Sequence, residues 1–103
     1  MLIVYSHSGV PIRLTDERWQ QIVDRLVEMV GQKNHVLETV AEPEMIQAGD
    51  FGELLAIRFY SQTPLTSKYF VVAYREFGTS DGFIVTAYLT GRPSARRKIL
   101  WKR

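Results

Sequence analysis

The expected fold of this chain depends on three successive pieces of sequence, KYFVVAYRE (Lys68–Glu76), FGTSD (Phe77–Asp81) and GFIVTAYLT (Gly82–Thr90). The outer two have the period-two pattern of strands and the middle one is a turn rich in Gly, Ser and Asp, so together they predict an antiparallel hairpin. We place Glu76 opposite Phe83, because a shift by one residue would mix the apolar and polar side chains. The apolar face then consists of Phe70, Val72, Tyr74, Val85, Ala87 and Leu89. The polar face consists of Tyr69, Val71, Ala73, Arg75, Ile84, Thr86, Tyr88 and Thr90.

A strand before the hairpin, Leu54–Tyr60, continues the same alternation. If Tyr60 pairs with Tyr69, this strand divides its side chains between the same two faces. The residues expected on the apolar face are Leu55, Ile57 and Phe59, and those expected on the polar face are Arg58 and Tyr60. Because the three strands agree, we predict that they share one sheet.

The N-terminal part of the chain predicts a hairpin followed by two helices. Leu2–Tyr5 and Val10–Leu14 are short apolar segments on either side of a turn that contains Gly and Ser. Thr15 is a good N-cap and Gly31 a fitting C-cap for a first helix. Its apolar residues recur at helical spacing and form a stripe of Trp19, Ile22, Val23, Leu26, Val27 and Val30. A second helix is expected over Lys33–Ala41.

The remaining segments complete an α+β domain. Met45–Ala48 predicts a short strand, and Pro93 ends the last strand of the hairpin. For Lys98–Trp101 two outcomes are open, an edge strand or apolar side chains docked on the core. The predicted architecture is an N-terminal hairpin and two helices packed on one face of an antiparallel sheet of about four strands.

Composition excludes several classes of function. The chain has 103 residues, 46% of them hydrophobic, which suits a single domain over residues 1–103 with a modest core. It contains no Cys, its acids are scattered and its two histidines lie far apart, so we expect no metal and no cofactor. Neither a phosphate-binding loop nor a serine-nucleophile elbow is present. No apolar run approaches the ~20 residues of a membrane helix, and we expect no membrane contact and a cytoplasmic location.

Charge is distributed unevenly along the chain. The net charge is +2, yet the segment Arg92–Arg103 contains six Lys or Arg residues and no acid. Such a basic end is either a solvated tail or a contact for phosphate groups, to which clustered cations are attracted regardless of sequence. Both alternatives remain open at this point.

The predicted polar sheet face is where we expect function. Arg58 and Arg75 would supply guanidinium groups, which match phosphate oxygens with paired hydrogen bonds. Tyr60, Tyr69 and Tyr88 can stack on unpaired bases. A base, an acid and cations around a phosphate are what a metal-independent ribonuclease needs. The alternative is an ordinary solvated sheet face, which is polar by default.

Two motifs resemble a known nuclease superfamily. The first helix reads E-R-W-x-x-I-V-x-R-x-x-E over Glu17–Glu28, and the last predicted strand ends in V-T-A-Y-L-T over Val85–Thr90. In this order they resemble the barnase–EndoU–colicin–RelE-like nuclease superfamily, and its small bacterial and phage-type members in particular, over Ile12–Thr90. The resemblance implies a metal-independent endoribonuclease, often deployed as a toxin that an antitoxin protein restrains.

The first helix departs from the pattern of these relatives at the positions where their histidines stand. Trp19, Ile22, Arg25 and Glu28 match the pattern. Gln21 stands where a histidine is common, and Leu26 and Val27 stand where a His-Pro pair is expected. The resemblance therefore implies a catalytically weakened relative, a deliberately inactivated version, or an enzyme that relies on Glu28 and the sheet arginines.

These considerations define the expected site. The expected catalytic residues are Arg58, Arg75, Tyr88, Thr86, Glu28 and Arg25. The expected RNA-binding residues are Tyr60, Tyr69, Thr90, Arg92, Arg96 and Arg97. The expected partners are single-stranded RNA and an antitoxin protein, while the oligomeric state is open. Two other functions are open as well, a non-catalytic RNA- or protein-binding module and a structural or self-associating domain.

Overall fold

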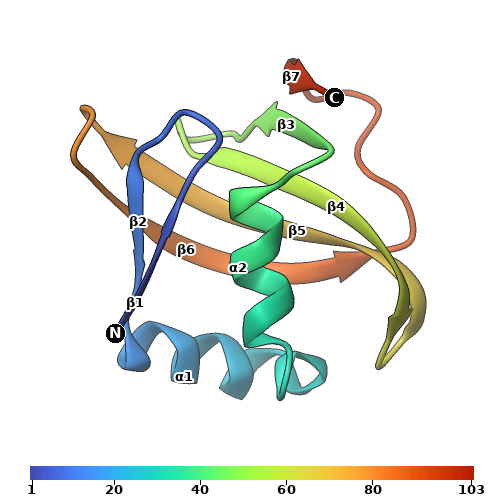
Figure 1. The fold of residues 1–103 in the computed structure, drawn as a ribbon. Helices are drawn as coiled ribbons and strands as arrows, with labels where there is room; N and C mark the ends of the chain where they lie inside the picture. Colours follow the sequence, from blue (N-terminus) through green and yellow to red (C-terminus); the bar gives the residue numbers. More distant parts are fainter.

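The computed structural model describes residues 1–103 as two α-helices, a short 3₁₀ helix and a seven-stranded sheet in the order β1-β2-β6-β5-β4-β3-β7 (Figure 1). The elements are β1 (Leu2–Tyr5), β2 (Pro11–Leu14), α1 (Asp16–Arg25), the 3₁₀ helix (Val27–Met29), α2 (Lys33–Ala41), β3 (Met45–Ala48), β4 (Leu54–Thr63), β5 (Thr66–Phe77), β6 (Asp81–Thr90) and β7 (Ile99–Lys102). The predicted α+β class is confirmed, but the prediction of about four strands is wrong. The N-terminal hairpin joins the sheet through a parallel pairing of β2 with β6, and β7 adds a strand at the other edge. Neither helix has the length and apolar character needed to cross a membrane.

The first helix begins at its predicted cap and ends well before the predicted one. The Thr15 hydroxyl accepts a hydrogen bond from the first turn of α1, as an N-cap does. Leu26 has an extended backbone (φ −128°, ψ 92°), which stops the helix. The 3₁₀ helix that follows buries Met29 completely, whereas Val27 and Val30 of the predicted apolar stripe are 76% and 56% exposed. Burial of Met29 in the core thus takes precedence over continuation of the helix.

The second helix has the predicted bounds and covers one face of the sheet. Its Val36 and Val40 are fully buried. The sheet face beneath it, here called the helix face, is formed by Ala56, Phe70, Val72, Tyr74, Ile84 and Ala87. Val72 is paired with Ala56 on one side and with Ala87 on the other. The two small side chains leave room for α2 to pack closely.

The β5–β6 hairpin keeps the predicted register over only part of its length. Tyr69 to Ala73 pair with Thr90 to Thr86, as expected. A bulge at Val85 then places Tyr74 opposite Ile84. Because a bulge adds one residue to one strand, it exchanges the faces of the residues beyond it. Ile84 therefore lies in the core (1% exposed) and Val85 on the opposite face, the reverse of the prediction.

The predicted register of β4 is wrong by one residue. Phe59, rather than Tyr60, lies opposite Tyr69. A one-residue slip moves every side chain of a strand to the other face. Arg58 therefore lies opposite Phe70 on the helix face, and Tyr60 lies on that face too. In the observed register, Ala56 of β4 faces α2 and provides a small side chain beneath the helix. In the predicted register, Ala56 would face away from α2.

The opposite face of the sheet, here called the outer face, is not an ordinary solvated surface. Leu55, Ile57, Val71 and Ala73 form a second apolar cluster on it, and none of them is more than 5% exposed. The loop between β3 and β4 and the segment between β6 and β7 lie against this face, as the hydrogen bonds and hollows described below show. The outer face, which was predicted to be polar, therefore contains a second, smaller hydrophobic core.

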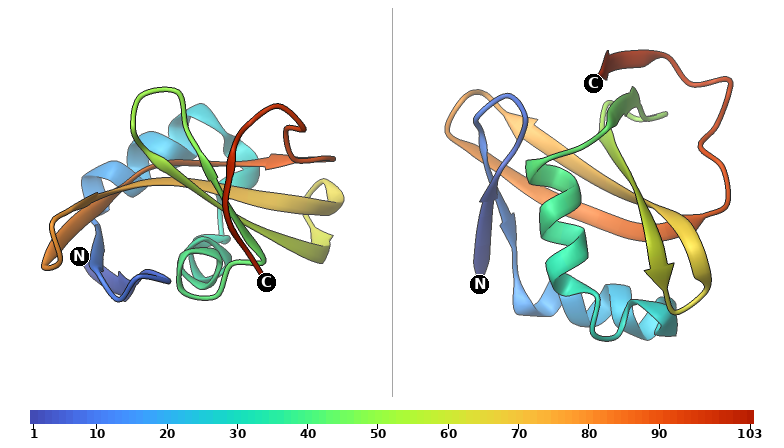
Figure 2. Two further views of the ribbon diagram at one scale, coloured as in Figure 1. Left: turned by 90° about the horizontal axis from the view of Figure 1, so that it is seen from above. Right: turned by 45° about the vertical axis from the view of Figure 1, so that its right-hand side comes forward.

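The two helices do not share one face of the sheet. Seen from above, α2 lies over one face of the sheet, whereas α1 lies at the β6 edge and extends past it toward the opposite side (Figure 2, left). In Figure 1, α1 lies beneath the sheet, alongside the part of β6 that β2 leaves unpaired. Ile22 of α1 is buried in the main core, while polar side chains of the same helix border β6. The predicted packing of both helices on one face is thus corrected, and the correction creates the groove described below.

The C-terminal segment forms an edge strand, one of the two outcomes left open by the sequence. In β7, Trp101 lies opposite Ile46 of β3. The Trp101 ring also lies 4.0 Å from the ring of His7, in the turn between β1 and β2. The last strand and the first hairpin therefore touch, although they stand at opposite ends of the strand order.

Candidate functional site

A groove of about 750 Å³ lies between α1 and β6. It is lined by Arg18, Gln21, Ile22, Asp24 and Arg25 of α1 and by Val85 and Thr86 of β6. Residues three, four and seven apart share one side of a helix, which explains why Arg18, Ile22 and Arg25 line the groove together. The bulge in β6 turns two consecutive residues, Val85 and Thr86, toward it. The lining of the groove thus depends on the helical spacing of α1 and on the bulge in β6.

The arginines of this groove differ from most others in the chain because no acid is paired with them. The arginines within 4 Å of a carboxylate are Arg13, Arg58, Arg97 and Arg103. Arg18 and Arg25 have no such partner and stand about 10 Å apart along α1. The one acid of the groove, Asp24, accepts a hydrogen bond from Gln20 at 2.7 Å. Two uncommitted guanidinium groups beside a hydroxyl, that of Thr86, can bind an anion through charged N–H donors.

A smaller hollow of about 250 Å³ lies farther along β6 on the outer face. It is lined by Gln47, Ile57, Val71, Tyr88, Thr90, Arg92, Pro93, Ser94 and Arg97. Tyr88 and Thr90 follow Thr86 at alternate positions, so the groove and the hollow are neighbours on one face. Gln47 is 2% exposed, and its side-chain nitrogen donates to the carbonyl oxygen of Ser94 at 2.8 Å. This bond attaches the segment between β6 and β7 to β3.

A loop between β3 and β4 holds the outer side of this hollow. Asp50 of the loop accepts two hydrogen bonds from Arg97, at 2.8 and 3.3 Å. Arg75 of β5 donates to the carbonyl oxygen of Phe51 at 2.7 Å. The backbone N–H of Phe51 donates to the carboxylate of Glu53, and this bond lowers the pKa of Glu53. Arg75 therefore lies on the outer face but supports the loop that positions Arg97.

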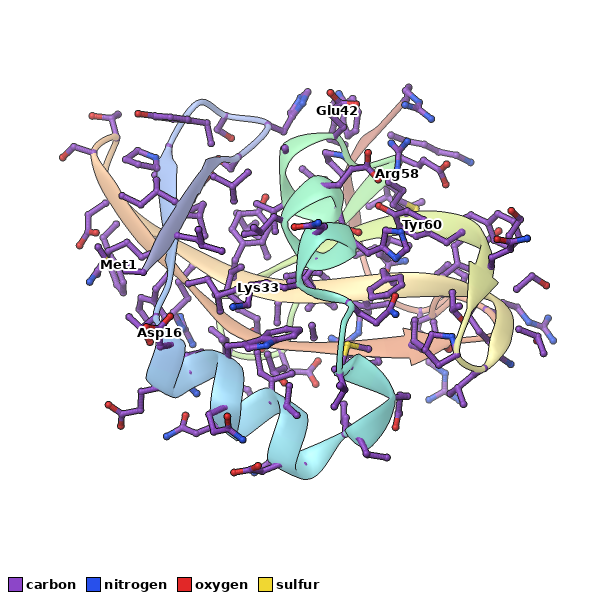
Figure 3. The ribbon with its side chains drawn as sticks, turned by 60° about the horizontal axis from the view of Figure 1, so that its bottom comes forward. Met1, Asp16, Lys33, Glu42, Arg58 and Tyr60 are labelled. Carbon is purple, nitrogen blue, oxygen red and sulfur yellow. The ribbon has the colours of Figure 1, made fainter.

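Arg58 and Tyr60, which the sequence placed with the other site residues, lie beside α2 (Figure 3). Arg58 donates to the carbonyl oxygen of Glu42 at 2.7 Å and lies 3.8 Å from the carboxylate of Glu38. The Tyr60 hydroxyl donates to Glu38 at 2.5 Å, and the ring of His35 lies 4.3 Å from that of Tyr60. Burial, together with the Glu38 carboxylate, raises the pKa of Tyr60 to about 12. These contacts attach α2 to β4, so the prediction that Arg58 and Tyr60 lie on the same sheet face as Thr86 and Tyr88 is wrong.

Half of the expected site residues line one of the two depressions. Arg25 and Thr86 line the groove, and Tyr88, Thr90, Arg92 and Arg97 line the hollow. The expected residues that line neither are Glu28, Tyr69, Arg75 and Arg96, in addition to Arg58 and Tyr60. Glu28 lies in the 3₁₀ helix, beyond the end of α1, because the helix stops earlier than predicted.

Several lining residues were not among those expected. The clearest are Arg18, Asp24 and Gln47. Arg18 and Asp24 stand on the polar side of α1 that also carries Arg25, so the helical spacing contained a signal for them. No sequence signal pointed to Gln47, because its place in the hollow depends on how β3 pairs with β4.

Comparison with protein-family models, with curated proteins and with solved structures found no match to this chain. The likeness to the nuclease superfamily therefore stays an expectation. No three His, Asp or Glu side chains lie together in a way that could hold a metal ion. The chemistry of the groove and the hollow is thus the basis for a functional assignment.

Proposed function

We propose that this protein binds single-stranded RNA along β6, with backbone phosphates held in the groove between α1 and β6. The observation that carries the proposal is the pair of unpaired guanidinium groups, Arg18 and Arg25, on the wall of this groove. An arginine already paired with a carboxylate must lose that partner before it binds phosphate, and these two have none to lose. The hydroxyl of Thr86, on the opposite wall, adds a further hydrogen-bond donor.

A polymer fits this surface better than a small anion does. Thr86, Tyr88 and Thr90 stand at alternate positions of β6, about 7 Å from one to the next. Arg92, which has no acidic partner, continues the line beyond the strand. Cations at both ends of a row of hydroxyls and an aromatic ring suit a strand of nucleotides, whose backbone is charged and whose bases stack. RNA rather than DNA is favoured because hydroxyl side chains can bond to the 2′-hydroxyl, and because of the resemblance to ribonucleases.

The test is a titration of fluorescently labelled single-stranded RNA, followed by anisotropy from about 50 to about 200 mM salt. We expect Arg18→Ala combined with Arg25→Ala to weaken binding about tenfold or more and to reduce the salt slope by about 1.4, since each phosphate contact contributes about 0.7. The matched control combines Arg58→Ala with Arg103→Ala, which removes the same charge from two ion-paired arginines away from the groove. Equal loss of affinity in the two double variants would show that net charge alone, and not the groove, binds RNA.

Metal-independent RNA cleavage is a second candidate, favoured by the carboxylate of Asp24 on the wall of the same groove. In such a reaction Asp24 would accept the proton of the 2′-hydroxyl, whose oxygen attacks the phosphorus while the guanidinium groups stabilise the added negative charge. The 5′-oxygen would leave with a proton from water, because Asp24 is the only carboxyl group that lines the groove and it serves as the base.

Incubation of RNA with the protein in the presence of EDTA tests the reaction. We expect slow cleavage that leaves 2′,3′-cyclic phosphate ends and is lost in Asp24→Asn, while RNA binding by this variant is retained. Intact RNA after incubation with the wild-type protein would remove the catalytic candidate and leave the binding proposal untouched.

A further inference from the structure

We infer that the hollow around Tyr88 is a nucleobase subsite, which receives the unpaired base of a nucleotide adjoining the phosphate in the groove. This inference rests on the proposed RNA binding and adds to it a second, chemically different contact. The groove would bind the phosphate backbone of any nucleic acid, whereas the hollow would bind only a nucleotide that carries a base.

The hollow has the size and the floor that a single base needs. Its volume of about 250 Å³ lies below the ~300–1,000 Å³ of sites for larger ligands. Ile57 and Val71 are 2% and 3% exposed and provide an apolar floor. Tyr88, which carries an aromatic ring, lines the same hollow. Every base has a flat π-face, so an aromatic ring and an apolar floor bind bases with little regard to sequence.

Polar groups in the hollow are held in place before any ligand arrives. The side-chain nitrogen of Gln47 is committed to the carbonyl oxygen of Ser94, while its side-chain oxygen accepts no hydrogen bond from the protein. This oxygen is therefore available to an N–H group on the edge of a base. Arg97 is oriented by its two bonds to Asp50 and presents further donors at the rim. A preformed set of donors and an acceptor reduces the ordering cost of binding.

The position of the hollow relative to the groove matches the path of one strand. Thr86 lines the groove and Tyr88 lines the hollow, and these two residues of β6 project from the same face about 7 Å apart. One extended nucleotide bridges such a distance. A strand whose phosphate lies between Arg18 and Thr86 can thus place a neighbouring base beside Tyr88 without crossing the sheet.

The test compares two ligands of about 12 units, an RNA with all its bases and an abasic ribose-phosphate chain with the same number of phosphates. We expect the wild-type protein to bind the intact RNA about tenfold or more tightly than the abasic chain. Tyr88→Ala should abolish this difference, whereas Tyr88→Phe, which keeps the ring, should preserve most of it. Urea denaturation of each variant checks that it is folded.

The outcomes separate this inference from the proposal on which it rests. Equal affinity of the wild-type protein for both ligands would overturn the base subsite and leave phosphate binding in place. A base-dependent difference that survives in Tyr88→Ala would overturn it too, because the bases would then bind elsewhere. Absence of binding to either ligand would remove both. A direct check is the side-chain amide resonance of Gln47, which should shift with intact RNA and not with the abasic chain.

Discussion

Replacement of Tyr74 by Phe should stabilise this protein, in contrast to most changes in a core. Tyr74 is fully buried on the helix face, and its hydroxyl is the one buried side-chain polar atom that has no hydrogen-bond partner. A hydroxyl taken out of water without a partner costs about 1–3 kcal/mol. Phe keeps the ring and its packing, and it loses only the contacts of one oxygen atom, each worth about 0.1–0.2 kcal/mol. We expect the free energy of unfolding to rise by about 1 kcal/mol.

Urea denaturation near neutral pH measures this gain. For a slope of about 1–1.5 kcal/mol/M, the midpoint should move upward by about 0.7–1 M with the slope unchanged. The matched control is Tyr60→Phe, in which the lost hydroxyl does have a partner, the carboxylate of Glu38 at 2.5 Å. This control should lower the free energy of unfolding by about 1 kcal/mol. A loss of stability in both variants would refute the reasoning, because it would mean that the Tyr74 hydroxyl also has a partner.

Three further predictions concern stability and the elements that carry the site. Burial raises the pKa of Tyr60 and of Tyr74 above the value of about 10 in an unfolded chain. The unfolded chain therefore loses these two protons at a lower pH than the folded protein does, so the free energy of unfolding should fall as the pH rises through 10 toward 12. Urea midpoints measured over this pH range should fall less steeply with pH in the variant that combines Tyr60→Phe with Tyr74→Phe. The same pH dependence in this variant and in the wild-type protein would contradict the role given to the two tyrosines. Thr15→Ala should lower the free energy of unfolding by about 1 kcal/mol, because α1 loses its N-cap bond to the backbone N–H of Arg18; thermal denaturation tests this, and an unchanged midpoint would argue against the cap. Arg58→Ala should destabilise the protein by about 1 kcal/mol in urea denaturation and leave its affinity for RNA unchanged, because its hydrogen bond serves α2. If the folded Arg58→Ala protein bound RNA more weakly, the binding surface would include the helix face, contrary to the proposal.

The sequence pattern within a segment was enough to predict those features that depend only on residues a few positions apart. The bounds of α2 and the Thr15 cap followed from helix signals that act over one or two turns. The register of the hairpin from Tyr69 to Ala73 followed from the alternation of its own side chains. The same alternation placed Thr86, Tyr88 and Thr90 together on one face, where they connect the groove and the hollow.

Two features of β4 and β6 could not be predicted in this way, because both faces of the sheet are buried in places. Leu55 and Ile57 are apolar enough for either core, so hydrophobicity alone did not decide which face they occupy. That choice depends on α2, which needs a small side chain such as Ala56 beneath it. The bulge at Val85 likewise satisfies the core, since it turns Ile84 inward.

The amino-acid sequence by itself determined the α+β class, the order of the elements and the presence of arginines on the polar side of the first helix. Only the tertiary structure decided which of the arginines meet. Arg58 and Arg25 end on different sides of the molecule because a one-residue slip in β4 reverses its faces, and because α1 packs along β6 instead of over the sheet. Contacts between segments far apart in the chain settle such choices, and period-two or helical spacing within one segment contains no information about them.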